Sequence, residues 1–351
     1  MANGILFFTD FHAHLFQEFA KADPDYYTDR FKEQCGVLDA MLSKASEENL
    51  EVVFGGDLFH KRGAVDVRVF NKVYGIFSKY ASRIPHTYLL RGNHDSYDNS
   101  MGSVSSLDTF TTLPNTTVIS MPESFETTTT VTVNGDEKRV KLFFMPYGEN
   151  IQDMKDKLKE FSLAVNSNNY NILVAHLGVD GAKQGRSVHR LAGAFTLDDM
   201  HADAFDYVYL GHFHARQKLA PNVFYGGSTM QLSFNDEGQE KGYDVLTHSG
   251  FKFFPVHTHQ FITLTDWGKK SQELAKDNYI RLQVSKSVAK EALEAGAPTV
   301  RVEAKADTEA KMRIDITAED SPERVVSKYT DTYYPKQKQL ALDILKKALD
   351  D

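Results

Sequence analysis

Short apolar runs that end in polar residues recur along the first two thirds of the chain. They occupy residues 5–8, 52–54, 88–90, 172–175 and 207–210, and each is followed within three residues by an aspartate, an asparagine or a histidine. An uninterrupted apolar run of this length is typical of a strand that is buried on both faces. We therefore expect buried strands that deliver reactive side chains at their carboxyl ends.

Amphipathic stretches lie between these runs. Residues 31–45, 69–80 and 154–165 each place apolar side chains on one face of a helix. We predict a helix over each stretch. The single cysteine, Cys35, falls on the apolar face of the first one, which favours a buried core residue over a reactive thiol.

A hairpin is predicted in the middle of the chain. The runs 127–133 and 138–145 flank Asn134 and Gly135, the pair of residues that favours a type I′ turn between antiparallel strands. The buried strands on either side are of the parallel kind. We therefore expect a mixed sheet.

The composition changes near residue 265, where a polar, lysine-rich segment covers residues 266–277. Beyond it, residues 279–284, 299–304 and 312–316 alternate like short strands, and a helix-forming run covers residues 288–295. The pattern predicts a second, smaller α+β unit.

Domain boundaries follow from this change. We expect a large domain over residues 1–265, a linker over 266–277, a small α+β domain over 278–335 and a terminal helix over 336–351. The terminal helix has a broad apolar face among lysines and aspartates. This face could dock on a partner or pack on its own domain, which is the commoner fate of such helices.

The bulk composition limits the class of protein. A single cysteine excludes an internal disulfide and a thiolate metal cluster. No apolar run approaches the length of a membrane span, so we expect a soluble, cytoplasmic protein.

The formal net charge of -8 argues against a protein that coats nucleic acid through a uniformly basic surface. It does not exclude a nuclease, because bound cations can supply the positive field that a phosphate needs.

Seven residues at the strand ends could ligate metal ions. Carboxylate and imidazole ligands suit manganese, iron or zinc, whereas a soft thiolate site would need more cysteines. One carboxylate can bridge two ions about 3.5–4 Å apart, the arrangement that clamps a phosphate during in-line displacement. Asp57 is our candidate bridge. The seven candidates are Asp10, His12, Asp57, Asn93, His176, His212 and His214.

The spacing of two pairs supports this interpretation. Asp10 with His12, and His212 with His214, are two residues apart, so both side chains of each pair can leave the strand end on the same side. His94 directly follows Asn93 and is our candidate for contacting the phosphate and protonating the leaving group.

Each short motif alone occurs often by chance, and a buried histidine is more often a hydrogen-bonded core residue than a ligand. Together, in order and each at a strand end, the motifs favour the metal site. The remaining histidines lack that placement, and we expect structural or surface roles for His14, His86, His189, His201, His248, His257 and His259.

As an ordered set, these motifs resemble the signature of the calcineurin-like metallophosphoesterases. The set consists of Asp10-Phe-His12, Gly56-Asp57-Leu-Phe-His60, Gly92-Asn93-His94-Asp95, His176 and Gly211-His212-Phe-His214. The resemblance implies an α/β fold of four αββα layers with mixed sheets, followed here by a small α+β capping domain. It also implies that one metal takes Asp10, His12, Asp57 and His214, and the other Asp57, Asn93, His176 and His212.

Within that superfamily, His60, Lys61 and Arg62 stand where the protein phosphatases have a second aspartate followed by Arg-Gly. The stretches 56–60 and 223–242 are instead similar to the SbcD-type nucleases. The resemblance covers residues 4–260 and becomes faint beyond them.

The SbcD resemblance implies a manganese-dependent DNA exonuclease and endonuclease of repair or recombination, with Fe²⁺, Zn²⁺ or Mg²⁺ as other possible metals. It further implies a homodimer that works with an SMC-like ATPase of the SbcC type. The implied catalytic residues are His94, His60 and Asp95. Nearby basic residues could position DNA phosphates or simply form a solvated face, namely Lys61, Arg62, Arg91, Lys183, Arg186 and Arg190.

Two other functions stay open. One is a stand-alone phosphodiesterase or phosphatase that acts on a small molecule or a phosphoprotein. The other is a non-catalytic scaffold with the same fold. The small C-terminal domain and the motif at residues 56–60 count against a small-molecule enzyme. The presence of every expected ligand and of His94 counts against a non-catalytic scaffold.

Overall fold

The computed structural model describes residues 1–184, 187–188, 195–294, 300–304 and 320–350. The chain forms two compact units, one made of residues 1–284 and 288–303 and the other of residues 285–287 and 304–351. Over the described ranges, no helix is both long and apolar enough to cross a membrane.

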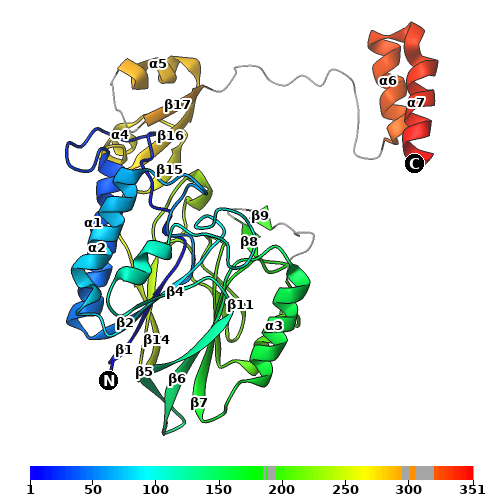
Figure 1. The fold of residues 1–351 in the computed structure, drawn as a ribbon. Coiled ribbons are helices and arrows are strands. Elements are labelled where there is room, and N and C mark those ends of the chain that lie inside the picture. The colour runs from blue at the N-terminus through cyan, green and yellow to red at the C-terminus, as the bar shows by residue number, and fades with distance from the viewer. Residues whose placement is uncertain (185–186, 189–194, 295–299, 305–319, 351) are drawn as a thin grey trace. The chain divides into compact units, whose positions relative to one another are not determined.

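The larger unit is built on two six-stranded mixed sheets (Figure 1). In the first sheet, four neighbouring strands are parallel, and two antiparallel strands extend one edge. Its order is β14 (Gly250–Pro255), β13 (Gly242–Thr247), β1 (Gly4–Phe8), β2 (Leu50–Phe54), β3 (Thr87–Leu90) and β4 (Thr116–Ile119).

The second sheet has a parallel centre and an antiparallel strand at each edge. Its order is β11 (Gln217–Ala220), β12 (Val223–Tyr225), β10 (Tyr207–Gly211), β7 (Asn169–His176), β6 (Asp136–Met145) and β5 (Glu123–Val133). A two-stranded ribbon, β8 (Lys183–Gln184) and β9 (Ser187–Val188), accompanies it.

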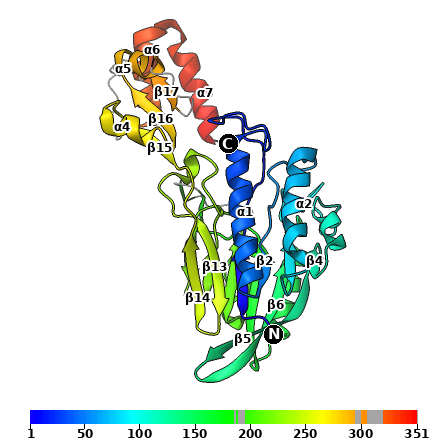
Figure 2. The same cartoon turned by 90° about the vertical axis from the view of Figure 1, so that its left-hand side faces the viewer.

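Helices cover the outer faces of both sheets. α1 (Asp29–Glu47) and α2 (Val67–Ala81) lie side by side over the first sheet (Figure 2), and α3 (Ile151–Leu163) packs on the second. Each helix begins after a polar cap whose side chain accepts a backbone N–H, namely Thr28, Asp66 and Asn150. The predicted αββα layers and three helices are therefore confirmed.

The continuous apolar runs reflect burial on both faces of each strand. In β1, Ile5 and Phe7 point into the core between the two sheets, whereas Leu6 and Phe8 pack in the core beneath α1 and α2. All four side chains are fully buried. Alternation cannot appear in the sequence of a strand whose two faces are both apolar.

The predicted hairpin joins β5 and β6. Asn134 (φ 54°) and Gly135 (φ 92°) both have the left-handed backbone that a type I′ turn requires. β6 then pairs in parallel with β7, so the sheet is mixed, as expected.

A small three-stranded sheet follows the two large ones, and we call it the small sheet. It contains β15 (Phe261–Leu264), β16 (Tyr279–Val284) and β17 (Val300–Ala304), with α4 (Lys269–Leu274) and α5 (Lys286–Glu294) beside it. Residues 266–277, predicted as a linker, contain α4, and Trp267 and Ala275 are buried in the core of this sheet. The strand predicted over residues 312–316 lies outside the described residues.

Over residues 320–350, the other unit forms a helical hairpin. α6 (Pro322–Tyr333) pairs with α7 (Lys338–Asp350). α7 corresponds to the terminal helix predicted over residues 336–351. α6 was not predicted from the sequence, although Ser321 caps it and Pro322 occupies its first turn.

Cys35 is buried in α1, as predicted. Burial raises the pKa of its thiol to about 12. The thiol is therefore protonated at neutral pH and acts as a small core side chain.

Candidate metal centre

The predicted ligands lie where the parallel strands of both sheets end. Asp10 and His12 follow β1, Asp57 follows β2, and Asn93 follows β3. In the second sheet, His176 ends β7, and His212 and His214 follow its neighbour β10. Because these strands are adjacent and parallel within each sheet, their carboxyl ends come together at one edge of the sandwich.

Four of these side chains form a first group. The Nε2 of His12 lies 3.0 Å from the Nε2 of His214, 3.6 Å from Oδ2 of Asp57 and 3.9 Å from Oδ1 of Asp10. The ligand atoms of Asp10, His12 and His214 lie within 4.8 Å of one another. Two carboxylates and two imidazoles therefore converge on one point.

A second group shares Asp57 with the first. The Nε2 of His176 lies 3.3 Å from Oδ2 of Asp57 and 3.1 Å from Oδ1 of Asn93. The Nδ1 of His212 lies 3.0 Å from the same amide oxygen. The Oδ2 atom of Asp57 therefore stands between the two groups, which is the position that a bridging ligand requires.

A backbone carbonyl orients the imidazole of His176. The Nδ1 of His176 donates to the carbonyl of Gly55 over 2.8 Å, so its Nε2 is the nitrogen that faces Asp57. The same arrangement in metalloproteins fixes the tautomer of a histidine ligand. The Nδ1 of His12 is buried without a hydrogen-bond partner among the described residues, and its Nε2 faces the first group.

Four of the proposed ligands have a left-handed backbone. The φ angles are 50° at Asp10, 49° at His12, 63° at Asp57 and 99° at His212. L-residues rarely adopt such angles, which cluster at functional sites where the surroundings enforce them. The loops thus turn sharply after each strand and aim the side chains inward.

Two glycines permit the close approach of the loops. A Cβ at Gly92 would lie 2.1 Å from Oδ1 of Asp57, and a Cβ at Gly56 would lie 2.2 Å from Nδ1 of His176. Any other residue at these positions would push a proposed ligand aside.

The electrostatics of the pocket favour a cation. Burial alone would raise the pKa of Asp57, but the surrounding imidazoles, His176 first, hold it well below its usual range. Burial alone would lower the pKa of His176, yet Asp57 and other neighbours raise it to about 9. Burial lowers the pKa of His12 well below its ordinary value and that of His212 to about 4, so both rings are neutral at pH 7.

The donor set fits a pair of divalent ions. Ionised carboxylate, amide oxygen and neutral imidazole are the ligands of manganese, iron and zinc sites. The described part of the centre offers these donors in two groups around a shared carboxylate. The geometry therefore suits the ligand assignment expected from the sequence.

His94 and His60 lie beside the first group. The Nδ1 of His94 donates to the carbonyl of His60 over 2.6 Å, and the two rings stack 5.9 Å apart. The ring of His94 also lies 4.8 Å from that of His12. Burial lowers the pKa of His60 to about 4, so this ring is neutral.

Asp95 ties together the loops that follow β2 and β3. Its buried carboxylate accepts N–H groups from Asp57, Leu58, Phe59 and Gly92 over 2.8–3.2 Å. Burial and the charge of Asp57 raise its pKa to about 7, against the effect of these donors. Its position indicates that it holds the loops rather than contacts a substrate.

The basic residues predicted to contact DNA have different placements. Lys61 and Arg62 are exposed on the loop that carries His60, and Lys183 is exposed in β8. Arg186 and Arg190 lie outside the described residues.

Arg91 does not fit a role in DNA binding. Its side chain is fully buried and donates to the carbonyls of Ser100, Ser103 and Tyr147. It cannot reach a bound strand without leaving these partners, so its role is to join three segments beneath the site.

Two residues beside the site were not predicted from the sequence. The ring of Tyr147 stacks on that of His212 at 5.9 Å and 28°. It follows the end of β6, as the proposed ligands follow their strands, and this position after a buried strand is the signal in its sequence. Lys241 donates to the carbonyl of His214 over 2.6 Å. It lies in the stretch 223–242 that is similar to the SbcD-type nucleases, but no local pattern predicts this contact.

Comparison with known proteins places this site in a family. The sequence model of the calcineurin-like phosphoesterases matches residues 4–216, more than half of the chain. The SbcD component of the nuclease SbcCD from Staphylococcus epidermidis is 38% identical over 98 residues, which are 27% of this chain and 26% of that protein. The match therefore spans about a quarter of the relative's length.

Among solved structures, the chain is similar to a dimetal phosphatase from Danio rerio (TM-score 0.44, 10% identity, 71% of this chain and 95% of that one). It is also similar to GAP50, the anchor in the inner membrane complex of Plasmodium (TM-score 0.43, 16% identity, 88% and 98%).

The pKa of His176 predicts that metal binding releases a proton. Below pH 9 its Nε2 carries a proton that must leave before the nitrogen can bind a cation, so raising the pH should strengthen binding. We expect Mn²⁺ affinity to rise about tenfold per pH unit between pH 6.5 and 8.5. Calorimetric titration in two buffers of different ionisation enthalpy measures the protons released. Binding that is independent of pH would contradict this assignment.

Proposed function

Because this chain belongs to the calcineurin-like phosphoesterase family, we propose that it is a dimetal phosphodiesterase that cleaves DNA, as the nuclease component of an SbcCD-type complex. Membership of the family makes it a metal-dependent hydrolase of the metallophosphoesterase type. The observation that carries the proposal is the pair of donor groups that share Oδ2 of Asp57.

In this proposal, Asp10, His12, Asp57 and His214 hold one divalent ion, and Asp57, Asn93, His176 and His212 hold the other. Two bound ions would supply the Lewis acidity that polarises the phosphate and activates water. We propose Mn²⁺ as the working metal, while the same donors also accept Fe²⁺, Zn²⁺ or Mg²⁺.

His94 is proposed to act on the phosphate and the leaving group. Since the carbonyl of His60 can only accept a hydrogen bond, the Nδ1 of His94 must donate, and its Nε2 remains for the substrate. The neutral ring of His60 stacks against His94 and limits its rotation. Asp95 supports both loops from beneath.

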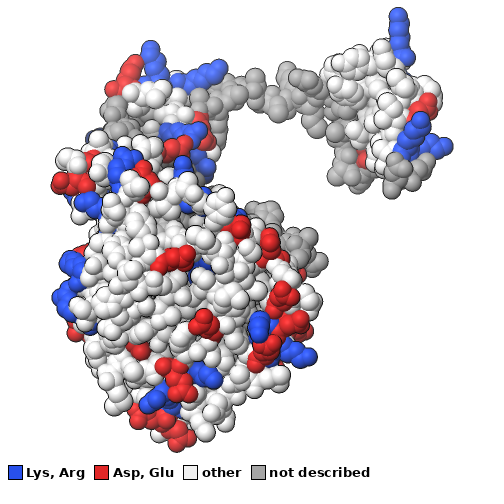
Figure 3. All heavy atoms as spheres, viewed as in Figure 1, with Lys and Arg blue, Asp and Glu red and all other residues white. Residues whose placement is uncertain are grey.

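The choice of DNA as substrate rests on the similarity to the Staphylococcus protein and on the motif that ends in His60. Lys61 and Arg62, which are exposed on the loop that carries His60, and Lys183, which is exposed in β8, are proposed to contact phosphates. On the face drawn in Figure 3, basic side chains are mixed with acidic ones, in keeping with the net charge of -8. DNA contacts would therefore be local, with the bound cations providing much of the attraction.

An SbcC-type ATPase is the proposed partner of the helical hairpin. Leu340 and Ile344 lie one helical turn apart on α7 and are 61% and 59% exposed. An apolar pair on one helix face is the recognition element of helix-in-groove and coiled-coil contacts.

We further propose that the protein forms a homodimer. Val67, Tyr97 and Val104 are each more than 70% exposed and line an apolar hollow of about 350 Å³ beside α2. Solitary exposed apolar residues are ordinary, whereas a cluster of three around a hollow marks an interaction surface.

The function is tested with linear double-stranded and circular single-stranded DNA, beside a small bis-aryl phosphodiester. We expect degradation of DNA with Mn²⁺, little with Mg²⁺ and none with chelator. Hydrolysis of the small ester with DNA left intact would indicate that the substrate is a small molecule. Absence of both activities in the Mn²⁺-loaded protein would favour the non-catalytic scaffold.

His94→Gln is expected to lower the rate of DNA cleavage about 10²–10⁴-fold, the range for loss of a general acid. Mn²⁺ binding, measured by calorimetry, should persist because the proposed ligands are intact. His257→Gln, which changes a histidine far along the chain, is the matched control. If His94→Gln also loses the metal, the proposed role is wrong.

Leu340→Glu with Ile344→Glu is expected to abolish binding of the SbcC-type ATPase in a pull-down, because two charges would enter an apolar interface. Lys346→Glu changes another residue of the same helix and should retain binding. Retained binding by the double variant would contradict the docking role of α7.

Tyr97→Glu is expected to convert a dimer into a monomer, since it places a charge within the apolar cluster. Light scattering after size exclusion gives the mass, and Lys79→Glu at the other end of α2, where Lys79 pairs with Asp39 of α1, is the control. A wild-type mass of one chain would refute the dimer.

A further inference from the structure

Lys241 is a buried cation whose three N–H groups are all engaged. Its Nζ donates to the carbonyl of His214 over 2.6 Å, to Oε1 of Gln239 over 2.9 Å and to Oδ1 of Asp236 over 3.0 Å. An ammonium group has three N–H donors, so every donor of Lys241 is used and the group is held in one orientation. The carbonyl of His214 also accepts the N–H of Ser228, which satisfies both of its lone pairs.

This arrangement fixes the backbone of a proposed metal ligand. The side chains of Lys241 and Asp236 are 3% and 2% exposed, and a buried ion pair is weak support for stability because of the desolvation it requires. The pair nevertheless fixes the position of His214, whose Nε2 lies 3.0 Å from that of His12.

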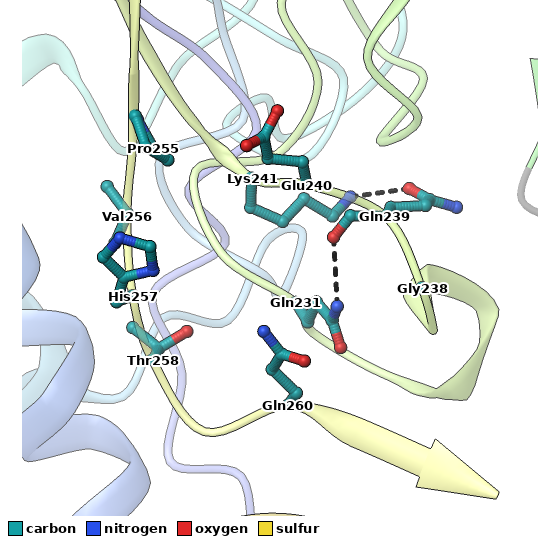
Figure 4. Close-up of a pocket in the computed structure, with 10 residues that line it drawn as sticks. All are labelled: Gln231, Gly238, Gln239, Glu240, Lys241, Pro255, Val256, His257, Thr258 and Gln260. Carbon is teal, nitrogen blue, oxygen red and sulfur yellow. Dashed lines mark hydrogen bonds between the residues drawn. The ribbon is translucent and has the colours of Figure 1, made fainter.

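The segment that carries Lys241 also holds the small sheet. Figure 4 shows the amide of Gln231 beneath the 238–241 turn, donating to the carbonyl of Gln239 over 3.1 Å. The Oε1 of the same amide accepts the N–H of Phe261, the first residue of β15, over 2.8 Å. One side chain thus links the turn beside Lys241 to the first strand of the small sheet.

Glu237 provides a second link. Its carboxylate accepts the N–H of Thr263 over 2.6 Å and the hydroxyl of the same residue over 2.7 Å, and lies 3.5 Å from Arg281 of β16. Two strands of the small sheet are therefore attached to the segment through this carboxylate.

Arg30 of α1 provides a third link. Its guanidinium donates to the carbonyl of Leu232 and lies over the rings of Phe261 and Tyr279, at 5.2 Å and 4.9 Å. A hollow of about 280 Å³ is lined by residues 238–241 and by the connection 255–260 (Figure 4), which are joined at one end by the hydrogen bond from the N–H of Val256 to the carbonyl of Lys241. The ring of Phe234 in the same segment also packs on the small sheet, 4.9 Å from the ring of Phe261 and 4.4 Å from the guanidinium of Arg281.

We propose that Lys241 is a positioning residue for His214, and that the segment 228–241 couples the small sheet to the metal centre. DNA that engages the small sheet would thereby change the affinity of the centre for its metal through His214. This coupling rests on the proposed DNA function. By linkage, bound metal must change DNA affinity by the same factor.

The positioning role is tested by the Mn²⁺ affinity of Lys241→Met, measured by calorimetry without any substrate. We expect affinity for one of the two ions to fall about tenfold, the lower end for loss of an outer-shell partner. Lys218→Met removes an exposed lysine close to His214 in sequence and should bind as the wild type does.

Since a lone buried Asp236 could unfold the single variant, Lys241→Met with Asp236→Asn removes both charges and keeps an acceptor for the N–H groups of Leu232 and Ser233. It should show the same loss, with melting temperature as the check on folding. Wild-type affinity in a folded variant of either kind would overturn the positioning role.

The coupling is tested by the ratio of Mn²⁺ affinities with and without a short phosphorothioate duplex. We expect a ratio above one in the wild type that falls towards one in Glu237→Ala, whereas Glu240→Ala, an exposed neighbour, keeps it. An unchanged ratio in Glu237→Ala would overturn the coupling. If the wild type binds no DNA, the proposed function and the coupling both fail, while the Lys241 titration still decides the positioning role.

Discussion

The structure depends on one carboxylate that two sheets must share. Asp57 follows β2 of the first sheet, yet its Oδ2 lies 3.3 Å from His176 at the end of β7 in the second. An ionised group that is buried needs compensating partners, and here imidazoles from both sheets provide them. The core between the sheets sets the separation between these partners. The geometry of the centre therefore depends on the packing of the interior.

The supporting groups follow from that constraint. Gly56 and Gly92 let the loops approach, the carboxylate of Asp95 gathers the N–H groups that the turns leave unpaired, and a carbonyl orients His176. None of these groups needs to touch a substrate. They reduce the conformational freedom of the donors before any ligand arrives, which is how preorganised sites gain affinity and rate.

Much of this arrangement could be predicted from the sequence, because local rules determine it. Apolar runs marked the strands, Asn134 with Gly135 marked the hairpin, and polar residues after each run marked the site. What failed depends on contacts between distant segments. Arg91 occupies a strand end like the ligands, but carbonyls from Ser100 and Tyr147 turn it into the interior. The burial of Lys241 likewise depends on His214, 27 positions earlier, and no periodicity reports it.

The left-handed residues of the centre carry a consequence for protein engineering. Asp10, His12, Asp57 and His212 each hold a conformation that costs about 1–3 kcal/mol, and aspartate and histidine are among the side chains that tolerate it best. Chemistry and backbone thus select the same amino acids at these positions. If only the side chains were transplanted onto regular strands, they would leave the backbone in different directions and would not converge. The transferable unit is the sharply turned loop together with the glycine that makes room for it.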